Sequence, residues 1–403
     1  FEKLSKVAKD KGFDKIATGH YFKAVENNGI IKYYKALDFN KDQSYFLAQV
    51  DKKALDDYNK FRESMRYLFD QLGGASVLII LNQIQFDFSS KTLRYNFRKT
   101  PPRFGTAELQ IPWGFLLNVA LSFWGTPRKL NAKKAKVIFT KICNISRQFF
   151  AVMEIQSLSM FEEMFRLPNE SLDELQEAIL YQQHMGLDQV PPNVMYLILK
   201  GMIGQHSVKK METVYLSILR WICDKQKGLE ILDFDKEMLK QDLHDHVSDE
   251  EIDSAMGELS TDSHELNHGY CDPRDFSKRN YYLRPFVKRG ESYFLLSAQF
   301  FVKGFYYAWR AHYSNNREIG ILFENYVADL LRSKGLTLYN NVKYSVSDVQ
   351  RAEMQSIRRD GECDIIIETS KTIFFIELKK REISDEASGG DPVAALKDMS
   401  DSA

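Results

Sequence analysis

The chain has 403 residues with 55 basic and 55 acidic side chains, so its formal net charge is zero. Hydrophobic residues make up 44% and charged residues 27%, which is typical of an ordinary soluble globular protein. The neutral total excludes a basic charge spread over the whole molecule, so any nucleic-acid surface has to be local.

Cysteine usage and apolar runs indicate the compartment. The four cysteines are scattered without CxxC spacing, which favours reduced thiols in a cytoplasmic protein over a disulfide framework. The longest apolar run, 111–124, is too short for a membrane span, and no signal peptide is visible. We therefore expect a cytoplasmic protein with no membrane partner. Because the chain begins with Phe1 rather than Met, we also expect it to be a fragment.

Residues 1–50 are predicted to form a small α/β block. The pattern predicts a helix over 1–11, a strand over 15–20 and a hairpin over 21–36. The hairpin turn contains Asn28-Gly29, which is a strong hairpin signal between two alternating runs. A plain α/β cap with no function of its own is the alternative interpretation of this block.

Two motifs in this block, IATGHY at 16–21 and NKDQSYFL at 40–47, resemble a middle segment of the bacterial tRNA-specific 2-thiouridylase family. The resemblance implies that Gly19 approaches ATP. It also implies that four side chains contact tRNA: His20, Lys41, Asp42 and Gln43. A glycine after a strand lets backbone approach a phosphate, and Lys and Gln suit phosphates and base edges. Neither the family's SGGxDS loop nor a cysteine occurs in 1–50, so we expect a remnant, fused to an unrelated protein, that cannot thiolate tRNA.

Residues 51–270 are predicted to be mainly helical, with an early β-hairpin. After a helical stretch over 51–75, the sequence predicts a strand over 75–81 and a hairpin formed by 83–88 and 92–97. From 107 to 262 the pattern is helical almost throughout. Capping boxes begin helices at Ser171 and Ser248, and 208–226 is amphipathic.

Basic residues gather between 91 and 136 with aromatic residues interleaved, which indicates a nucleic-acid surface if the cations meet phosphates and the rings stack on bases. The alternative is an ordinary solvated face. The basic residues are Lys91, Arg94, Arg98, Lys99, Arg103, Arg128, Lys129, Lys133, Lys134 and Lys136.

Residues 244–271 contain a candidate zinc site. Four histidines and a cysteine lie close together in the sequence: His244, His246, His264, His268 and Cys271. Their spacing matches no defensible zinc signature, so we expect surface histidines.

Residues 271–403 contain the stretch with the strongest chemical signal, GECDIIIETSKTIFFIELKKR at 361–381. It predicts two apolar strands, 363–368 and 372–378, joined by a polar turn. Asp364 lies in the first strand, while Glu377 and Lys379 end the second and project to the same side. Converging carboxylates suit Mg²⁺, and a neighbouring ammonium can orient a water. The alternative is a hairpin that ends in a solvated charge cluster.

This D-x12-E-x-K spacing resembles the PD-(D/E)xK restriction-endonuclease-like superfamily. The resemblance implies that Asp364 and Glu377 bind the metal, that Lys379 is catalytic, and that Glu324 in a helix over 320–331 supports the site. Cys363 stands where the family often has Pro. A hairpin over 281–297, a helix over 300–313 and a strand over 336–346 lead into this core, which we expect to be C-terminally incomplete at Ala403.

The expected fold class is α/β plus all-α: an α/β fragment over 1–50, a mainly helical region over 51–270, and a restriction-endonuclease-like α/β core over 271–403. The leading functional hypothesis is a nuclease that uses Mg²⁺ or Mn²⁺ to hydrolyse DNA or RNA. A tRNA- and ATP-binding fragment and a non-catalytic interaction scaffold are the alternatives. The sequence does not indicate an oligomeric state.

Overall fold

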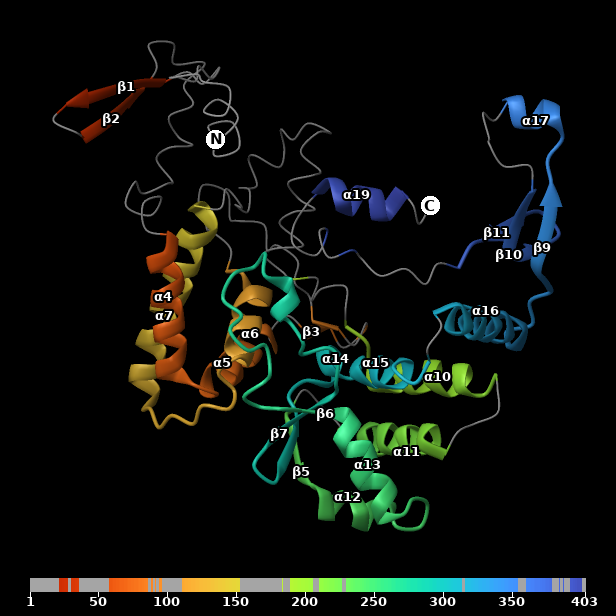
Figure 1. Ribbon diagram of the computed structural model, residues 1–403, viewed down its shortest axis with the longest axis horizontal. Helices are drawn as coiled ribbons and strands as arrows, with labels where there is room; N and C mark the ends of the chain where they lie inside the picture. Colours follow the sequence, from red (N-terminus) through yellow and green to blue (C-terminus); the bar gives the residue numbers. More distant parts are fainter. Residues whose placement is uncertain are drawn as a thin grey trace.

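The computed structural model of the protein describes residues 22–27, 30–35, 58–85, 88–89, 91, 94–95, 111–152, 183, 189–205, 210–226, 230–313, 316–353, 360–378, 384, 387 and 392–400. Within these ranges, no helix is both long and apolar enough to cross a membrane. Figure 1 shows helices grouped around a small sheet, with a separate three-stranded sheet, β9 to β11, at the right edge of the molecule.

The N-terminal hairpin is confirmed. Strands β1 (Phe22–Asn27) and β2 (Ile30–Lys35) pair antiparallel, with Asn27 opposite Ile30, so that the predicted Asn-Gly turn falls between them. The helix predicted over 1–11 and the strand predicted over 15–20 lie outside the described residues.

Four helices form the first helical layer: α4 (Tyr58–Leu72), α5 (Ala75–Gln85), α6 (Trp113–Leu121) and α7 (Ala132–Val152). α4 packs along α7, and α5 packs on α6. Gly73 allows the sharp turn between α4 and α5, because its φ is +54° and a Cβ there would lie 2.2 Å from the carbonyl oxygen of Thr126.

The strand predicted over 75–81 is wrong, because this segment lies in the helix α5. Val77, Ile80 and Ile84 repeat at helical spacing and are all buried. An uninterrupted apolar run does not distinguish a buried strand from a buried helix. The hairpin predicted over 83–88 and 92–97 is confirmed only in part, since residues 83–85 lie in α5. β3 (Phe88–Ser89) and β4 (Arg94–Tyr95) pair antiparallel over two residues each.

A second group of helices contains α10 (Pro192–Ile203), α11 (Lys210–Lys225), α12 (Lys236–Leu243) and α13 (Asp249–Leu259). The predicted amphipathic helix is confirmed as α11, which buries Tyr215, Ile218 and Ile222. The predicted capping box is also confirmed: the Ser248 backbone N–H donates to Glu251 Oε2 at 2.8 Å, and the Glu251 N–H donates to Ser248 Oγ at 3.4 Å. The capping box predicted at Ser171 lies outside the described residues.

A four-stranded sheet lies between these helices, in the order β5 (Leu232–Asp235), β8 (Ser292–Leu295), β7 (Phe286–Arg289), β6 (Ser260–Asp262). The β7–β8 hairpin was predicted, whereas β5 and β6 fall in the stretch predicted to be helical almost throughout. Because their partners lie at least 24 residues further along the chain, no local pattern could indicate them. The predicted domain boundary at residue 270 falls inside this sheet.

The main core surrounds this sheet and continues into two short helices, α14 (Ala298–Phe301) and α15 (Gly304–Arg310), which replace the single helix predicted over 300–313. Its largest fully buried side chains include Phe115, Phe149, Tyr270, Phe305 and Trp309. Aromatic rings from α6, α7 and the loop before β7 pack together in this core. The ring centroid of Phe115 lies 5.2 Å from that of Phe150 and 6.0 Å from that of Tyr270.

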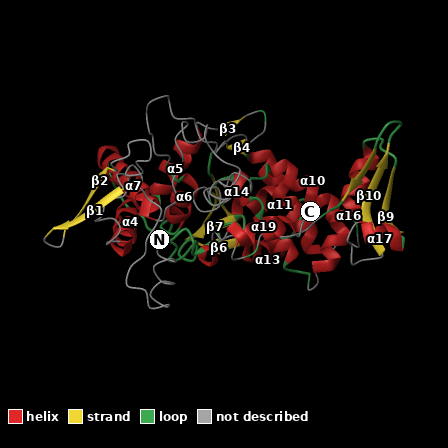
Figure 2. Cartoon of the chain, turned by 90° about the horizontal axis from the view of Figure 1, so that it is seen from above, coloured by secondary structure: helices red, strands yellow, loops and turns green. Residues whose placement is uncertain are grey.

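The C-terminal part consists of α16 (Asn316–Ser333), β9 (Leu338–Ser345), α17 (Asp348–Glu353), β10 (Asp360–Glu368), β11 (Ile373–Ile376) and α19 (Pro392–Ser400). The sheet order is β11-β10-β9, and both pairs are antiparallel. In Figure 2, β9 and β10 lie beside α16 at the right end of the molecule. The order of helix, strand and hairpin is the predicted one, while its assignment to the restriction-endonuclease-like fold stays a prediction.

Candidate functional site

The β10–β11 hairpin is fixed by its packing on α16. Ile365 and Ile367 of β10 are buried against Ala328 of α16, and Leu378 joins the same small core. Side chains alternate along a strand, so Asp364 projects from the opposite face of the sheet, away from this core. The hydrophobic pattern of the hairpin therefore determines where its carboxylate points.

Asp364 is held at the end of the hairpin by the backbone of the facing strand. The N–H of Leu378 donates to Asp364 Oδ2 at 2.6 Å, and the side chain is partly buried. No described residue donates to the second carboxylate oxygen of Asp364. The hydrogen bond orients the carboxylate and leaves one oxygen for a ligand.

Glu377 lies directly before Leu378 and is exposed. The register pairs Ile365 with Ile376, so one further step along it places Asp364 opposite Glu377. Opposite residues of an antiparallel pair share a face, with Cβ atoms about 5 Å apart. The two predicted metal ligands are thus brought to the same face and the same end of the hairpin, whereas Lys379 lies outside the described residues.

Glu324 occupies a different position. It lies on α16 one turn before Val327 and Ala328, on the stripe that packs against the sheet, and it is partly buried. Within the part of the chain that the structure describes, no three His, Cys, Asp or Glu side chains converge to hold a metal ion. The structure therefore brings Asp364 and Glu377 together without adding Glu324 as a third ligand.

The histidines weighed for zinc do not form a cluster in the described structure. His244, His246, His264 and His268 are exposed, and His244 Nδ1 contacts the carbonyl oxygen of Gln241 at 2.7 Å. Cys271 is buried and its Sγ lies 3.5 Å from the carbonyl oxygen of Arg62. Burial raises the pKa of the Cys271 thiol to about 11, which disfavours the thiolate that a metal would need.

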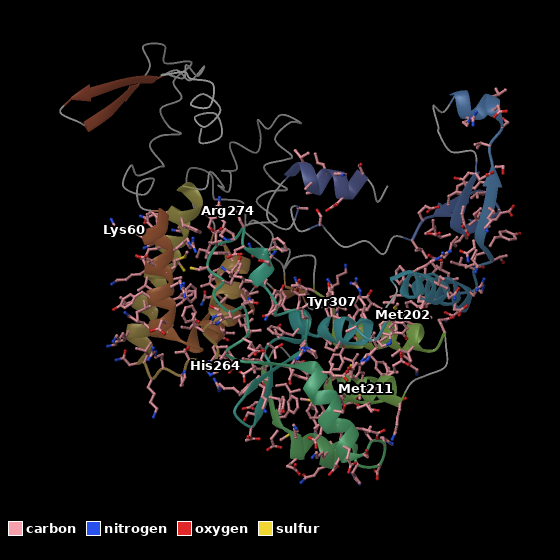
Figure 3. All side chains as sticks on the ribbon, viewed as in Figure 1. Lys60, Met202, Met211, His264, Arg274 and Tyr307 are labelled. Atoms are coloured by element: carbon pink, nitrogen blue, oxygen red, sulfur yellow. The ribbon has the colours of Figure 1, made fainter. Side chains whose placement is uncertain are left out.

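A polar cluster that the sequence did not indicate lies between α11, α13 and the end of α15. Glu258 Oε2 accepts a hydrogen bond from the Tyr215 hydroxyl and lies 2.9 Å from His312 Nε2. The pKa of Tyr215 is raised, mainly because the side chain is buried and also because its hydroxyl donates to the Glu258 carboxylate. Glu258 and His312 line an open cavity of about 600 Å³ together with Arg284 and Tyr307. Of these four residues, Tyr307 is labelled in Figure 3. Since these residues are up to 97 positions apart, no motif could predict the cluster.

Every residue assigned to ATP or tRNA in the N-terminal block lies outside the described residues: Gly19, His20, Lys41, Asp42 and Gln43. Of this block, the structure describes the β1–β2 hairpin alone. The binding roles of these five residues stay predictions.

Comparison with known proteins finds similarity in the N-terminal part of the chain. Residues 1–60 match the family described as the tRNA methyl transferase HUP domain. The tRNA-specific 2-thiouridylase of Campylobacter hominis is 53% identical over 55 residues, which are 14% of each chain. That of Rickettsia massiliae is 38% identical over 76 residues, 19% of this chain and 18% of the relative. The similarity thus extends beyond the predicted limit at residue 50.

The match is short relative to those proteins. A further 2-thiouridylase, from Campylobacter jejuni, is 57% identical over 53 residues, or 13% of this chain and 14% of its own. The chain therefore spans about one seventh of the length of these relatives. No solved structure matches the chain.

Proposed function

We propose that the C-terminal part of this protein is a metal-dependent nuclease domain of the PD-(D/E)xK kind. The observation that carries the proposal is the placement of Asp364 and Glu377 at one end of the β10–β11 hairpin, with Asp364 fixed by the Leu378 N–H. The order of α16, β9, β10 and β11 supports it, because a helix followed by an antiparallel meander is the arrangement that the D-x12-E-x-K resemblance implies.

The two carboxylates fit a divalent metal ion. Both are hard oxygen donors, and Mg²⁺ is commonly held by one or two carboxylates while it keeps several waters. Asp364 presents an oxygen that no described residue contacts, and Glu377 is exposed beside it. Tyr339, Ile373 and Phe375 lie on the same face and are each more than half exposed, so a substrate can approach these carboxylates within the described structure.

Each residue has a defined part in the proposed reaction. Bound Mg²⁺ or Mn²⁺ would lower the pKa of an attacking water and neutralise charge on the scissile phosphate. Asp364 and Glu377 bind the ion, and the Leu378 N–H keeps Asp364 in position. We assign to Lys379 the orientation of the attacking water, which is the part that its family position implies.

The proposal is tested by incubating the full chain with end-labelled duplex DNA, single-stranded DNA and RNA in Mg²⁺, in Mn²⁺ and in EDTA. We expect internal cleavage products with either metal ion and none in EDTA. A folded protein that cleaves none of the three substrates would favour a non-catalytic scaffold role.

A second function is supported by the similarity of residues 1–60 to 2-thiouridylases. We propose that this segment contacts tRNA through His20, Lys41, Asp42 and Gln43 and approaches ATP through Gly19. A gel-shift titration with unmodified tRNA checks this proposal: the Lys41→Ala, Gln43→Ala variant should bind several-fold more weakly, and equal binding would contradict it.

A further inference from the structure

The helix α7 and the loop before it carry an unusual charge. Residues 111–152 contain seven basic residues and no acidic one, although the whole chain has equal numbers of both. The seven are Arg128, Lys129, Lys133, Lys134, Lys136, Lys141 and Arg147. Such a local excess attracts a polyanion even when the molecule as a whole is neutral.

The lysines of α7 share its solvent-facing side. Ile138, Ile142, Phe149 and Phe150 are buried on the opposite side, in the core that includes α4 and Phe115. The exposed side also carries Val137 and Thr140. The name α7 basic face is used here for its long polar side chains: Lys133, Lys134, Lys136, Lys141, Asn144 and Gln148. In Figure 3, nitrogen-tipped side chains stand out around α4 and α7.

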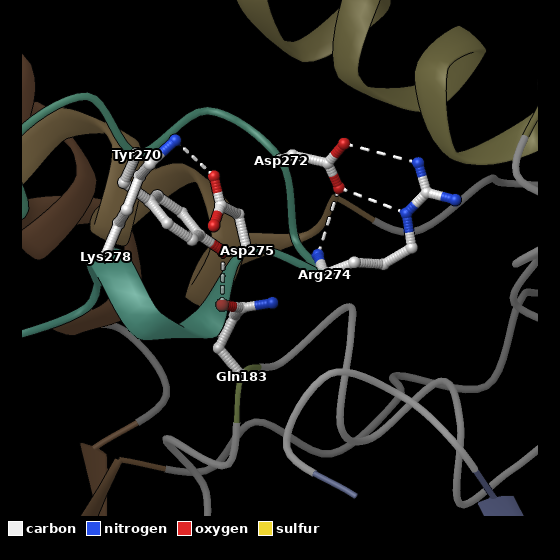
Figure 4. Close-up of polar contacts among 6 residues, drawn as sticks. All are labelled: Gln183, Tyr270, Asp272, Arg274, Asp275 and Lys278. Carbon is white, nitrogen blue, oxygen red and sulfur yellow. Dashed lines mark hydrogen bonds and ion pairs between the residues drawn. The ribbon is translucent and has the colours of Figure 1, made fainter. Parts of the chain in front are cut away.

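The ammonium groups of the α7 basic face, and that of Lys129 before it, have no carboxylate partner among the described residues. Some described lysines elsewhere in the chain are paired with carboxylates. Lys236 and Lys240 both contact Asp253, at 2.7 and 3.0 Å. In the loop next to α4, Arg274 pairs with Asp272 and Lys278 with Asp275, as Figure 4 shows. Neighbouring positive charges without carboxylate partners repel one another, and a bound anion would lower this repulsion.

The α7 basic face is also held in place before any ligand arrives. Arg128 donates to both carboxylate oxygens of Asp70 on α4, at 3.0 and 2.9 Å, and to the Asp70 carbonyl oxygen at 3.0 Å. The side chain of Asn131 accepts from the Lys134 N–H at 2.8 Å and so begins α7. These contacts fix the start of α7 relative to α4, which lowers the entropy lost on binding.

We propose that the α7 basic face binds the phosphodiester backbone of a nucleic acid without reading its sequence. A helix of 21 residues is about 31 Å long, close to one turn of a duplex, which presents about one phosphate charge per 1.7 Å. Asn144 and Gln148 extend the row of lysines with side chains that hydrogen-bond to phosphate and sugar oxygens. This interaction does not rest on the metal site of the β10–β11 hairpin.

The composition of the α7 basic face disfavours an anionic membrane as the partner. A helix that binds in a bilayer interface inserts an apolar side between the lipids. The apolar side of α7 is occupied by the protein core, and its exposed side carries one large apolar residue, Val137, among lysines and amides. Cations alone are sufficient to bind the nucleic-acid backbone, because they neutralise its phosphates.

The test compares two double variants that remove the same charge. The test variant, Lys133→Gln, Lys141→Gln, removes two charges from the α7 basic face. The control variant, Lys236→Gln, Lys240→Gln, removes two lysines that pair with Asp253. Binding of a fluorescein-labelled 20-base-pair DNA duplex and of the corresponding RNA strand is measured by anisotropy from 50 to 200 mM salt. EDTA is present so that no cleavage occurs. Vesicles containing phosphatidylserine serve as the competing surface.

We expect the α7 variant to bind at least one of the two nucleic acids about tenfold or more weakly, with a duplex salt slope smaller by about 2, since each phosphate contact contributes about 0.9. The control variant should bind within twofold of wild type, whether or not the protein cleaves. Equal weakening in both double variants, no effect of Lys133→Gln, Lys141→Gln, or binding to vesicles but not to nucleic acid would overturn the proposal.

Discussion

Asp364→Asn is expected to lower the rate of metal-dependent cleavage by at least 100-fold. Asparagine keeps the size of the side chain and can still accept the Leu378 N–H, but it removes the negative charge that binds the cation. Removing one preorganised electrostatic group from an active site costs about 100- to 1,000-fold in rate. Initial rates on the best substrate, at saturating Mg²⁺ and single-turnover protein concentrations, measure the effect.

Asp360→Asn is the matched control. Asp360 begins the same strand, on the same face by alternation, and its carboxylate accepts a hydrogen bond from Ser345 Oγ. Four residues of strand separate it from Asp364 by about 13 Å, beyond the reach of one metal ion. Its rate should stay within about threefold of wild type. Comparable losses of cleavage rate in the two variants would indicate a general effect of charge or stability. Full activity of Asp364→Asn would show that the catalytic site lies elsewhere.

Trp309→Ala is expected to have the largest effect on stability, a loss of about 4 to 5 kcal/mol in the free energy of unfolding. Trp309 is fully buried, and its ring lies 4.9 Å from that of Tyr313. Its Nε1 donates at 2.8 Å to Glu212 Oε1, a carboxylate that is itself buried. The alanine variant leaves a cavity and removes a donor from a buried charge, and both effects destabilise the fold.

Urea unfolding followed by far-ultraviolet circular dichroism measures this change, since the signal does not depend on the tryptophan removed. Trp309→Phe separates the two contributions: it fills most of the volume and loses the hydrogen bond to Glu212, for an expected cost of about 1.5 to 3 kcal/mol. An alanine variant within 1 kcal/mol of wild type would show that Glu212 and its surroundings can rearrange at little cost.

Elements with a local physical cause were predicted well. The Ser248 capping box needs only the hydroxyl and a carboxylate three residues later, and the β1–β2 hairpin follows from Asn28-Gly29 between two alternating runs. The β10–β11 hairpin likewise combines two apolar runs with a short polar turn. In each case, the residues that make the structure lie within about fifteen positions of one another.

Elements that depend on distant partners were missed. β5 forms a strand because it hydrogen-bonds to β8, which lies 57 or more residues later in the chain. α5 forms a helix because its apolar stripe packs against α6. The same limit applies to the site. The spacing of Asp364 and Glu377 predicted their meeting across one hairpin, whereas the contact of Tyr215, Glu258 and His312 requires three helical segments to pack first. No local pattern contains that information.

The measurement that tests the proposed metal centre most directly is a change of metal preference in Glu377→Cys. A thiolate binds soft ions such as Cd²⁺ well and Mg²⁺ poorly. If Glu377 binds the catalytic ion, this variant loses cleavage in Mg²⁺ and regains it on addition of Cd²⁺, while Cd²⁺ gives wild type and Asp364→Asn no such gain. Unchanged cleavage in Mg²⁺, or a loss that Cd²⁺ leaves uncorrected in a folded variant, would contradict the assignment of Glu377 as a metal ligand.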